Sequence, residues 1–249
     1  MTTPSGIPAQ TIAQAAEATA RLLRSVEEMT PEQVLQPSVL PGWTRGHVLS
    51  HISRNADALC NLLRGARTSQ PIPMYPSPEA RDRGIEDGAR RPPADQLADL
   101  RASGLRFTAA CEAMPPEAWS IPVPHRLGPF PAFGVPYKRV SEVEYHHVDL
   151  GLDYTPAHWP TEFVTRELAS LTERLRDAPD LPPLLLHDSD TDTGYRLGSY
   201  GVESGSAQTP EPLRLSGPAG ALVAWLSGRA DGSALGVPAA DLPALPPLG

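Results

Sequence analysis

The chain of 249 residues is 40% hydrophobic and 20% charged, with a formal net charge of −8. That length allows one large or two small hydrophobic cores, so we expect a folded globular protein. The acidic balance argues against a nucleic-acid binder, because such proteins gather basic residues to neutralise phosphates. No apolar run reaches the roughly 18 residues of a membrane span, and the start, MTTPSGIPAQ, lacks the features of a signal peptide. We therefore expect a cytoplasmic protein.

Hydrophobic periodicity predicts four long helices in the first part of the chain. Apolar side chains recur at helical spacing over residues 9–29, 44–66, 94–114 and about 137–153. The segment TSQPIPMYPSPEARDRG, residues 68–84, carries four prolines and is predicted to be an ordered crossover without helix or strand. A second proline-rich stretch, 121–136, is predicted to be a loop.

The second part of the chain has a different texture. A helix is expected over 160–177, followed by three short strand-like runs, PPLLLHD, TGYRLG and PLRLSG, and a helix over 218–228. The proline-rich tail from Pro238 is expected to be irregular. We therefore predict α plus α/β architecture, with a four-helix bundle over 1–157 and a smaller α/β domain over 158–249.

The fourth predicted helix carries a polar stripe in the sequence SEVEYHHVDLG. On a helical wheel, four side chains share an arc of about 80°: Arg139, Glu142, His146 and Asp149. This stripe borders an apolar face that includes His147, and Glu144 falls outside both. Spacing alone favours two salt bridges within the stripe, Arg139 with Glu142 and Asp149 with His146. The alternative is a metal, which would compensate a glutamate and a histidine pressed toward a core.

The second predicted helix supplies a further inward histidine. In GHVLSHISRNADALCNLL, His51 lies at the edge of the apolar arc, whereas His47 is turned toward solvent and is interpreted as a surface or capping residue. His51 together with Glu142 and His146 would make two imidazoles and one carboxylate, the ligand set of an open zinc site. Another divalent metal would also suit these ligands.

The two cysteines show no pattern of a metal or redox site. Cys60 and Cys111 are far apart in sequence and the chain has no CxxC motif, so we interpret both as free thiols.

Three segments resemble a known family: LPGWTRGHVLSHISRNADALCNLL, PMYPSPEARDRGIEDGA and KRVSEVEYHHVDLG. They are similar to the mycothiol-dependent maleylpyruvate isomerases, a branch of the DinB-like metal-binding helical bundles. The resemblance implies that His51, Glu142 and His146 are the zinc ligands. It also matches the arginine of PMYPSPEAR to Arg81, and a C-terminal Gly-Arg pair to Gly228 and Arg229.

The resemblance implies a thiol-dependent reaction. Zinc would hold the thiol of mycothiol as a thiolate. The thiolate would add to the cis double bond of maleylpyruvate and leave again after rotation, giving fumarylpyruvate. The substrate is a dicarboxylate, so Arg81 and Arg229 are the candidate catalytic residues that hold it. By position alone they would be a surface arginine and an arginine favoured by a helix dipole.

Two other functions stay open. One is a mycothiol S-transferase that acts on another electrophile, and the other is a metal-bundle regulatory protein without catalysis. The PMYPSPEAR segment favours the isomerase over the transferase, and a complete ligand set disfavours the regulator. We expect a monomer whose partners are a small dicarboxylate and a low-molecular-weight thiol.

Overall fold

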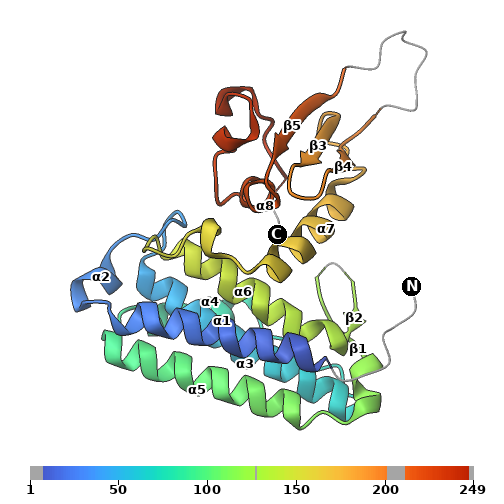
Figure 1. Ribbon diagram of the computed structural model, residues 1–249. Coiled ribbons are helices and arrows are strands. Elements are labelled where there is room, and N and C mark those ends of the chain that lie inside the picture. The colour runs from blue at the N-terminus through green and yellow to red at the C-terminus, as the bar shows by residue number, and fades with distance from the viewer. Residues whose placement is uncertain (1–7, 127, 201–210, 247–249) are drawn as a thin grey trace. The chain divides into compact units, whose positions relative to one another are not determined.

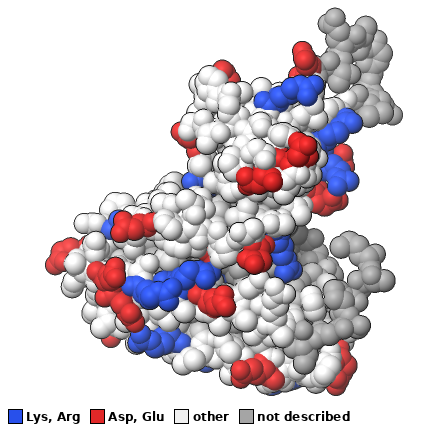
Figure 2. Space-filling model, in the orientation of Figure 1, with Lys and Arg blue, Asp and Glu red and all other residues white. Residues whose placement is uncertain are grey.

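The chain folds as two units, Met1–Tyr154 and Thr155–Gly249. The computed structural model describes residues 8–126, 128–200 and 211–246 of them. The first seven residues, in which we expected no signal peptide, lie outside these ranges. In the described ranges, no helix is long and apolar enough to cross a membrane. Acidic and basic side chains are interspersed over the face seen in Figure 2, and neither charge forms a continuous surface there.

Long helices build the N-terminal unit and lie side by side (Figure 1). Helix α1 packs on α5 and α6, and α3 packs on α4, α5 and α6. The helices are α1 (Ala9–Glu27), α2 (Pro31–Leu35), α3 (Arg45–Thr68), α4 (Pro78–Ala89), α5 (Pro93–Glu112) and α6 (Val135–Asp149). Their shared core includes Leu22, Leu49, Ile52, Leu100, Val143 and Leu150, and each such fully buried side chain contributes about 1.5–3 kcal/mol. The four predicted helices are therefore present, with ends shifted by a few residues.

The start of α3 is fixed by a reciprocal cap. The Thr44 side chain accepts a hydrogen bond from the His47 backbone N–H, and the Thr44 N–H donates to His47 Nδ1 at 3.1 Å. The other ring nitrogen of His47 lies 3.0 Å from Glu86 of α4. His47 is therefore a capping histidine, as its sequence position predicted, and it fixes the helix one turn before His51.

The prediction of a non-helical crossover over 68–84 is wrong for its last part, because α4 begins at Pro78. Proline stands at the first helical position, where its missing N–H costs nothing, and the Ser77 side chain accepts a hydrogen bond from Ala80 N–H. Helix α4 lies very close to α3: a Cβ added at Gly88 would come within 2.2 Å of Ser50 Oγ. Only glycine allows this contact.

Two further segments differ from the prediction. The loop expected over 121–136 contains a short hairpin, β1 (Pro122–Val123) paired antiparallel with β2 (Phe130–Pro131), and α6 begins before its end. Helix α6 ends at Asp149, four residues earlier than expected. Gly151 follows with φ +64°, the left-handed conformation that terminates helices.

In its described residues, the C-terminal unit holds a three-stranded sheet and two α-helices. The strands lie in the order β4–β3–β5, with β3 antiparallel to β4 and parallel to β5. They are β3 (Leu184–Asp188), β4 (Thr193–Leu197) and β5 (Leu213–Gly217), and the helices are α7 (Thr161–Leu175) and α8 (Ala219–Leu226). All three predicted strand runs and both helices are confirmed. Side chains of β3 alternate, with Leu184 and Leu186 buried and His187 exposed, so one face of the sheet belongs to the core.

Candidate metal centre

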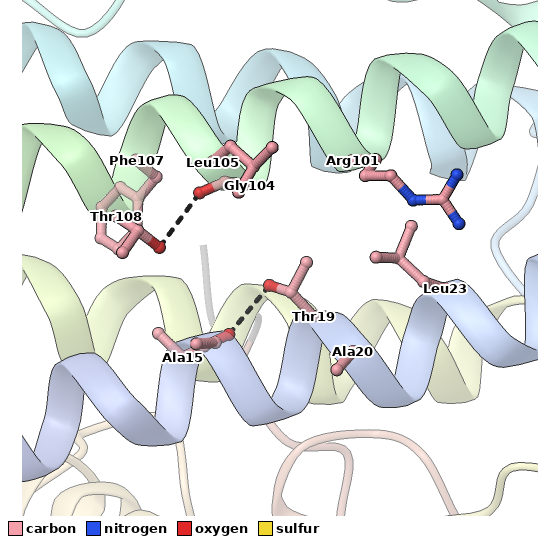
Figure 3. Close-up of a pocket in the computed structure, with 10 residues that line it drawn as sticks. Ala15, Thr19, Ala20, Leu23, Arg101, Gly104, Leu105, Phe107 and Thr108 are labelled. Atoms are coloured by element: carbon pink, nitrogen blue, oxygen red, sulfur yellow. Dashed lines mark hydrogen bonds between the residues drawn. The ribbon is translucent and has the colours of Figure 1, made fainter.

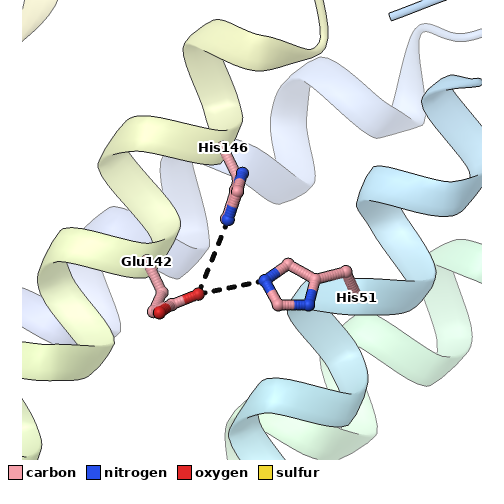
Figure 4. Close-up of side chains that lie close together, drawn as sticks. All are labelled: His51, Glu142 and His146. Atoms are coloured by element: carbon pink, nitrogen blue, oxygen red, sulfur yellow. Dashed lines mark hydrogen bonds and ion pairs between the residues drawn. The ribbon is translucent and has the colours of Figure 1, made fainter. Parts of the chain in front are cut away.

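Three side chains from two helices converge in the N-terminal unit (Figure 4). His51 comes from α3, and Glu142 and His146 come from α6; one donor atom of each lies within 4.8 Å of the others. The Glu142 Oε2 atom is 3.0 Å from His51 Nε2 and 3.6 Å from His146 Nε2. The two imidazole rings meet edge to face, with centroids 4.6 Å apart. The structure thus brings together all three ligands predicted from the sequence.

The surroundings of His51 are apolar. His51 is 6% exposed, and the Trp43 ring packs against the His51 ring with centroids 5.5 Å apart. Its Nδ1 atom is buried and has no hydrogen-bond partner among the described residues. Burial lowers the pKa of His51, and the positive charges of His146 and Arg81 lower it further, against the influence of Glu142. His51 is therefore neutral near pH 7, the form in which an imidazole binds metal.

The orientation of His146 is set by a buried carboxylate. His146 Nδ1 lies 2.8 Å from Asp149 Oδ2, and the Asp149 side chain is 2% exposed. A proton on Nδ1 donated to Asp149 leaves the lone pair on Nε2, facing Glu142. Burial would lower the pKa of His146, but Asp149 and Glu142 outweigh it and raise that pKa. The predicted pairing of Asp149 with His146 is therefore present, in the arrangement that supports a metal-binding histidine.

Glu142 is ionised. Burial would raise its pKa, but hydrogen bonds with His146 and His51 and the charges of both hold the pKa well below its usual range. The other salt bridge considered from spacing, Arg139 with Glu142, does not form: the Arg139 guanidinium donates to Ile52 O at 2.7 Å. Two imidazoles and one carboxylate on rigid helices suit zinc or a similar divalent ion, and they leave further coordination positions open.

The two candidate arginines lie in different units. Arg81 of α4 donates to Asp82 at 2.8 Å, and its side chain is 34% exposed; its charge is among the influences that lower the pKa of His51. Arg229 directly follows α8 and donates to Ser227 O at 2.6 Å. The predicted role of Arg229 beside the metal site stays a prediction.

Glu144 and His147 face helix α1 instead of the metal site. Glu144 is 1% exposed and accepts hydrogen bonds from Arg21 of α1 and from the Tyr154 hydroxyl. The His147 ring stacks on Tyr154 with centroids 3.8 Å apart, and its Nε2 atom lies 2.8 Å from Ser25 Oγ. The helical wheel left Glu144 outside both faces, because it could not show that α1 covers that side of α6.

The cysteines are free thiols, as predicted. Burial raises the pKa of Cys60 to about 11 and that of Cys111 to about 12. Neither belongs to the cluster of metal-ligand atoms.

A separate groove lies between α1 and α5 and is lined mainly by apolar side chains, with Arg101 at one end (Figure 3). None of the predicted site residues lines it.

Fold and site together define a two-unit protein in which an N-terminal helical unit presents a His-Glu-His cluster that could hold a metal ion, and a small α/β unit follows. Residues 15–151 match the family model described as mycothiol maleylpyruvate isomerase N-terminal domain, and residues 158–247 match the MDMPI C-terminal domain. The chain belongs to the mycothiol maleylpyruvate isomerase family, which confirms the resemblance seen in the sequence.

Solved structures agree with this assignment. The crystal structure of the mycothiol-dependent maleylpyruvate isomerase superposes with a TM-score of 0.84 and 27% identity, covering 99% of this chain and 100% of that one. A variant of that isomerase with a histidine replaced by alanine gives a TM-score of 0.83 with the same identity and coverage. No curated protein sequence is similar enough to match.

Proposed function

We propose that this chain is a zinc- and mycothiol-dependent cis–trans isomerase that converts maleylpyruvate to fumarylpyruvate. The observation that carries the proposal is the convergence of His51, Glu142 and His146 in a chain of this family. The fold likeness to an isomerase over nearly the whole chain supports it.

The three ligands have the protonation states that a divalent cation requires or can impose. Glu142 is ionised and His51 is neutral, and Asp149 holds the ring of His146 in place. A zinc ion bound here would supply a positive charge that stabilises the thiolate form of a thiol beside it. Mycothiol supplies that thiol, since Cys60 and Cys111 have raised pKa values and lie outside the cluster.

Arg81 binds and stabilises the acidic substrate in this proposal. Addition of the thiolate turns the cis double bond into a single bond, about which the molecule can rotate. In this intermediate, negative charge is delocalised onto the neighbouring carbonyl oxygen. A guanidinium close to His51 lies where it can stabilise that charge and hold a carboxylate. Arg229 is proposed to hold the second carboxylate, so that the C-terminal domain, 158–249, completes the active site.

The direct test is an ultraviolet assay with purified protein, zinc, mycothiol and maleylpyruvate. Conversion to fumarylpyruvate should require both zinc and mycothiol, and mycothiol should not be consumed. Stoichiometric loss of mycothiol with formation of a stable adduct would instead identify an S-transferase. Absence of any reaction by the zinc-loaded protein would contradict both enzyme functions.

The arginine roles are tested by Arg81→Lys and Arg229→Lys. A point-charge ammonium cannot reproduce the bidentate hydrogen bonds of a guanidinium, so each variant should lose roughly 1–3 kcal/mol of transition-state stabilisation in kcat/KM. Zinc content should stay unchanged, because neither arginine is a ligand. Activity within about twofold of the unmodified protein would remove that arginine from the site.

A further inference from the structure

Arg139 is a fully buried arginine whose hydrogen-bonding capacity is only partly used. It lies on α6 three residues before Glu142 and is 0% exposed. Its Nη1 atom donates to Ile52 O at 2.7 Å and to Asn55 Oδ1 at 3.4 Å, both on α3. Its Nε and Nη2 atoms are buried, and no acceptor among the described residues bonds to them. Nη1 is therefore hydrogen-bonded, whereas Nε and Nη2 have no acceptor among the described residues.

The free side of the guanidinium still carries positive charge. Burial lowers the pKa of Arg139 to about 10, with Glu142 the strongest of the acidic groups that oppose this. The arginine is consequently protonated near pH 7. A buried cation with unused donors is costly unless an acceptor reaches it, so the arrangement is unfavourable in the protein by itself and favours an anionic ligand.

A second unused donor belongs to the same neighbourhood. The Tyr75 hydroxyl, on the connection between α3 and α4, is buried, and its proton has no acceptor in the described part of the chain. Burial and then Glu142 raise its pKa to about 12, whereas Arg81 lowers it, and Tyr75 is among the groups that act on Arg139. The charge of Glu142 thus acts on both donors, one on α6 and one on the α3–α4 connection.

We propose that Arg139 and Tyr75 form a carboxylate-binding subsite next to the metal centre. The two guanidinium nitrogens without acceptors, Nε and Nη2, and one phenol match the acceptor oxygens of a carboxylate. Three residues of α6 correspond to a rise of about 4.5 Å, so a short acidic molecule can reach the metal-ligand cluster and this subsite together. That the bound carboxylate belongs to the substrate rests on the proposed function.

The subsite is closed in the structure, because the free donor atoms of both residues are buried. Arg139 is tied to α3 within the helical core, whereas Tyr75 lies in a non-helical connection. We therefore place the entrance on the Tyr75 side, where the chain is not held in a helix.

The test is calorimetric titration of maleate, a small dicarboxylate, into the zinc-loaded protein. Arg139→Met keeps an unbranched side chain that reaches about as far as Nε and removes all the donors; it should weaken maleate binding by about tenfold or more, as expected for charge-assisted hydrogen bonds. Tyr75→Phe removes one neutral hydroxyl and should weaken binding by roughly threefold. Arg101→Met, on the exposed side of α5 where Arg101 pairs with Glu27, is the matched control and should bind like the unmodified protein.

Zinc content and melting temperature are measured for every variant. Maleate affinity unchanged in both Arg139→Met and Tyr75→Phe, or absent from the unmodified protein, would overturn the subsite. If Arg139→Met does not fold, Tyr75→Phe decides the question, because loss of one hydroxyl does not disturb the α3–α6 contact. Weakened maleate binding in a protein that does not isomerise maleylpyruvate would retain the subsite and refute the proposed reaction.

Discussion

Asp149→Asn isolates the part of the metal site that lies outside the ligand set. Asp149 is almost fully buried and its Oδ2 atom lies 2.8 Å from His146 Nδ1. Asparagine has nearly the same shape and keeps one acceptor oxygen, so the substitution removes the negative charge and leaves the packing in place. What changes is the basicity and the fixed orientation of the His146 ring.

The expected loss is about 10- to 100-fold in zinc affinity, or roughly 1.4–2.7 kcal/mol. A charge-assisted hydrogen bond of about 1.5–3 kcal/mol accounts for a loss of this size. The size of this loss depends on pH. Asp149 contributes to the raised pKa of His146, so the variant has a lower pKa there and suffers less competition from protons. The difference should be largest at about pH 8, above the ordinary histidine pKa, and should shrink as the pH falls through the raised pKa of His146.

Zinc affinity is measured by competition with a chromophoric chelator at several pH values, with circular dichroism to confirm folding. Asp153→Asn is the matched control, since Asp153 is exposed and follows the end of α6; its zinc affinity should be unchanged. A folded Asp149→Asn protein that binds zinc within about twofold of the unmodified protein at pH 8 would refute the positioning role of Asp149.

Four further outcomes are expected. His51→Ala should lose zinc stoichiometry by metal analysis, whereas His147→Ala should keep it, because His147 bonds to Ser25 and stacks away from the cluster. Glu144→Gln should also keep zinc but lower the free energy of unfolding by about 1–3 kcal/mol in urea, since it weakens a buried ion pair with an arginine of α1. The Cys60→Ser/Cys111→Ser protein should remain active with added mycothiol; retained zinc and folding with lost turnover would reveal an internal nucleophile. In the unmodified protein, alkylation of Cys60 by iodoacetamide at about pH 8 should be roughly a hundredfold slower than for an ordinary cysteine and should accelerate toward its pKa of about 11.

The convergence of His51, Glu142 and His146 could be predicted from sequence because it depends on local helical geometry. Glu142 and His146 are one turn apart on α6, and the periodicity of the surrounding apolar residues shows which side of each helix faces inward. His51 follows from the same reasoning on α3. The pairing of the two helices needed one further assumption, that inward polar residues meet, and the distances in the cluster support it.

Other features of the N-terminal unit depend on tertiary contacts that periodicity does not contain. Glu144 is buried because Arg21 and Tyr154 reach it from segments distant in sequence. Arg139 was expected to pair with Glu142 one turn away, but it is drawn to the Ile52 carbonyl on α3. Helix α4 was missed because prolines were counted as helix breakers, although Pro78 stands at the position where proline favours a helix start.

The fold holds the His-Glu-His cluster more rigidly than it holds Tyr75 and Arg81. The candidate ligands His51, Glu142 and His146 lie on α3 and α6 within the helical unit, so their geometry should change little when a substrate binds, whereas Tyr75 and Arg81 lie on and just beyond the non-helical connection between α3 and α4. Connections of this kind tolerate substitution and movement far better than core helices. Selectivity for an acidic substrate should therefore be alterable at Tyr75 and Arg81 without loss of zinc, while changes to His51 or Glu142 should abolish every metal-dependent reaction of the site together.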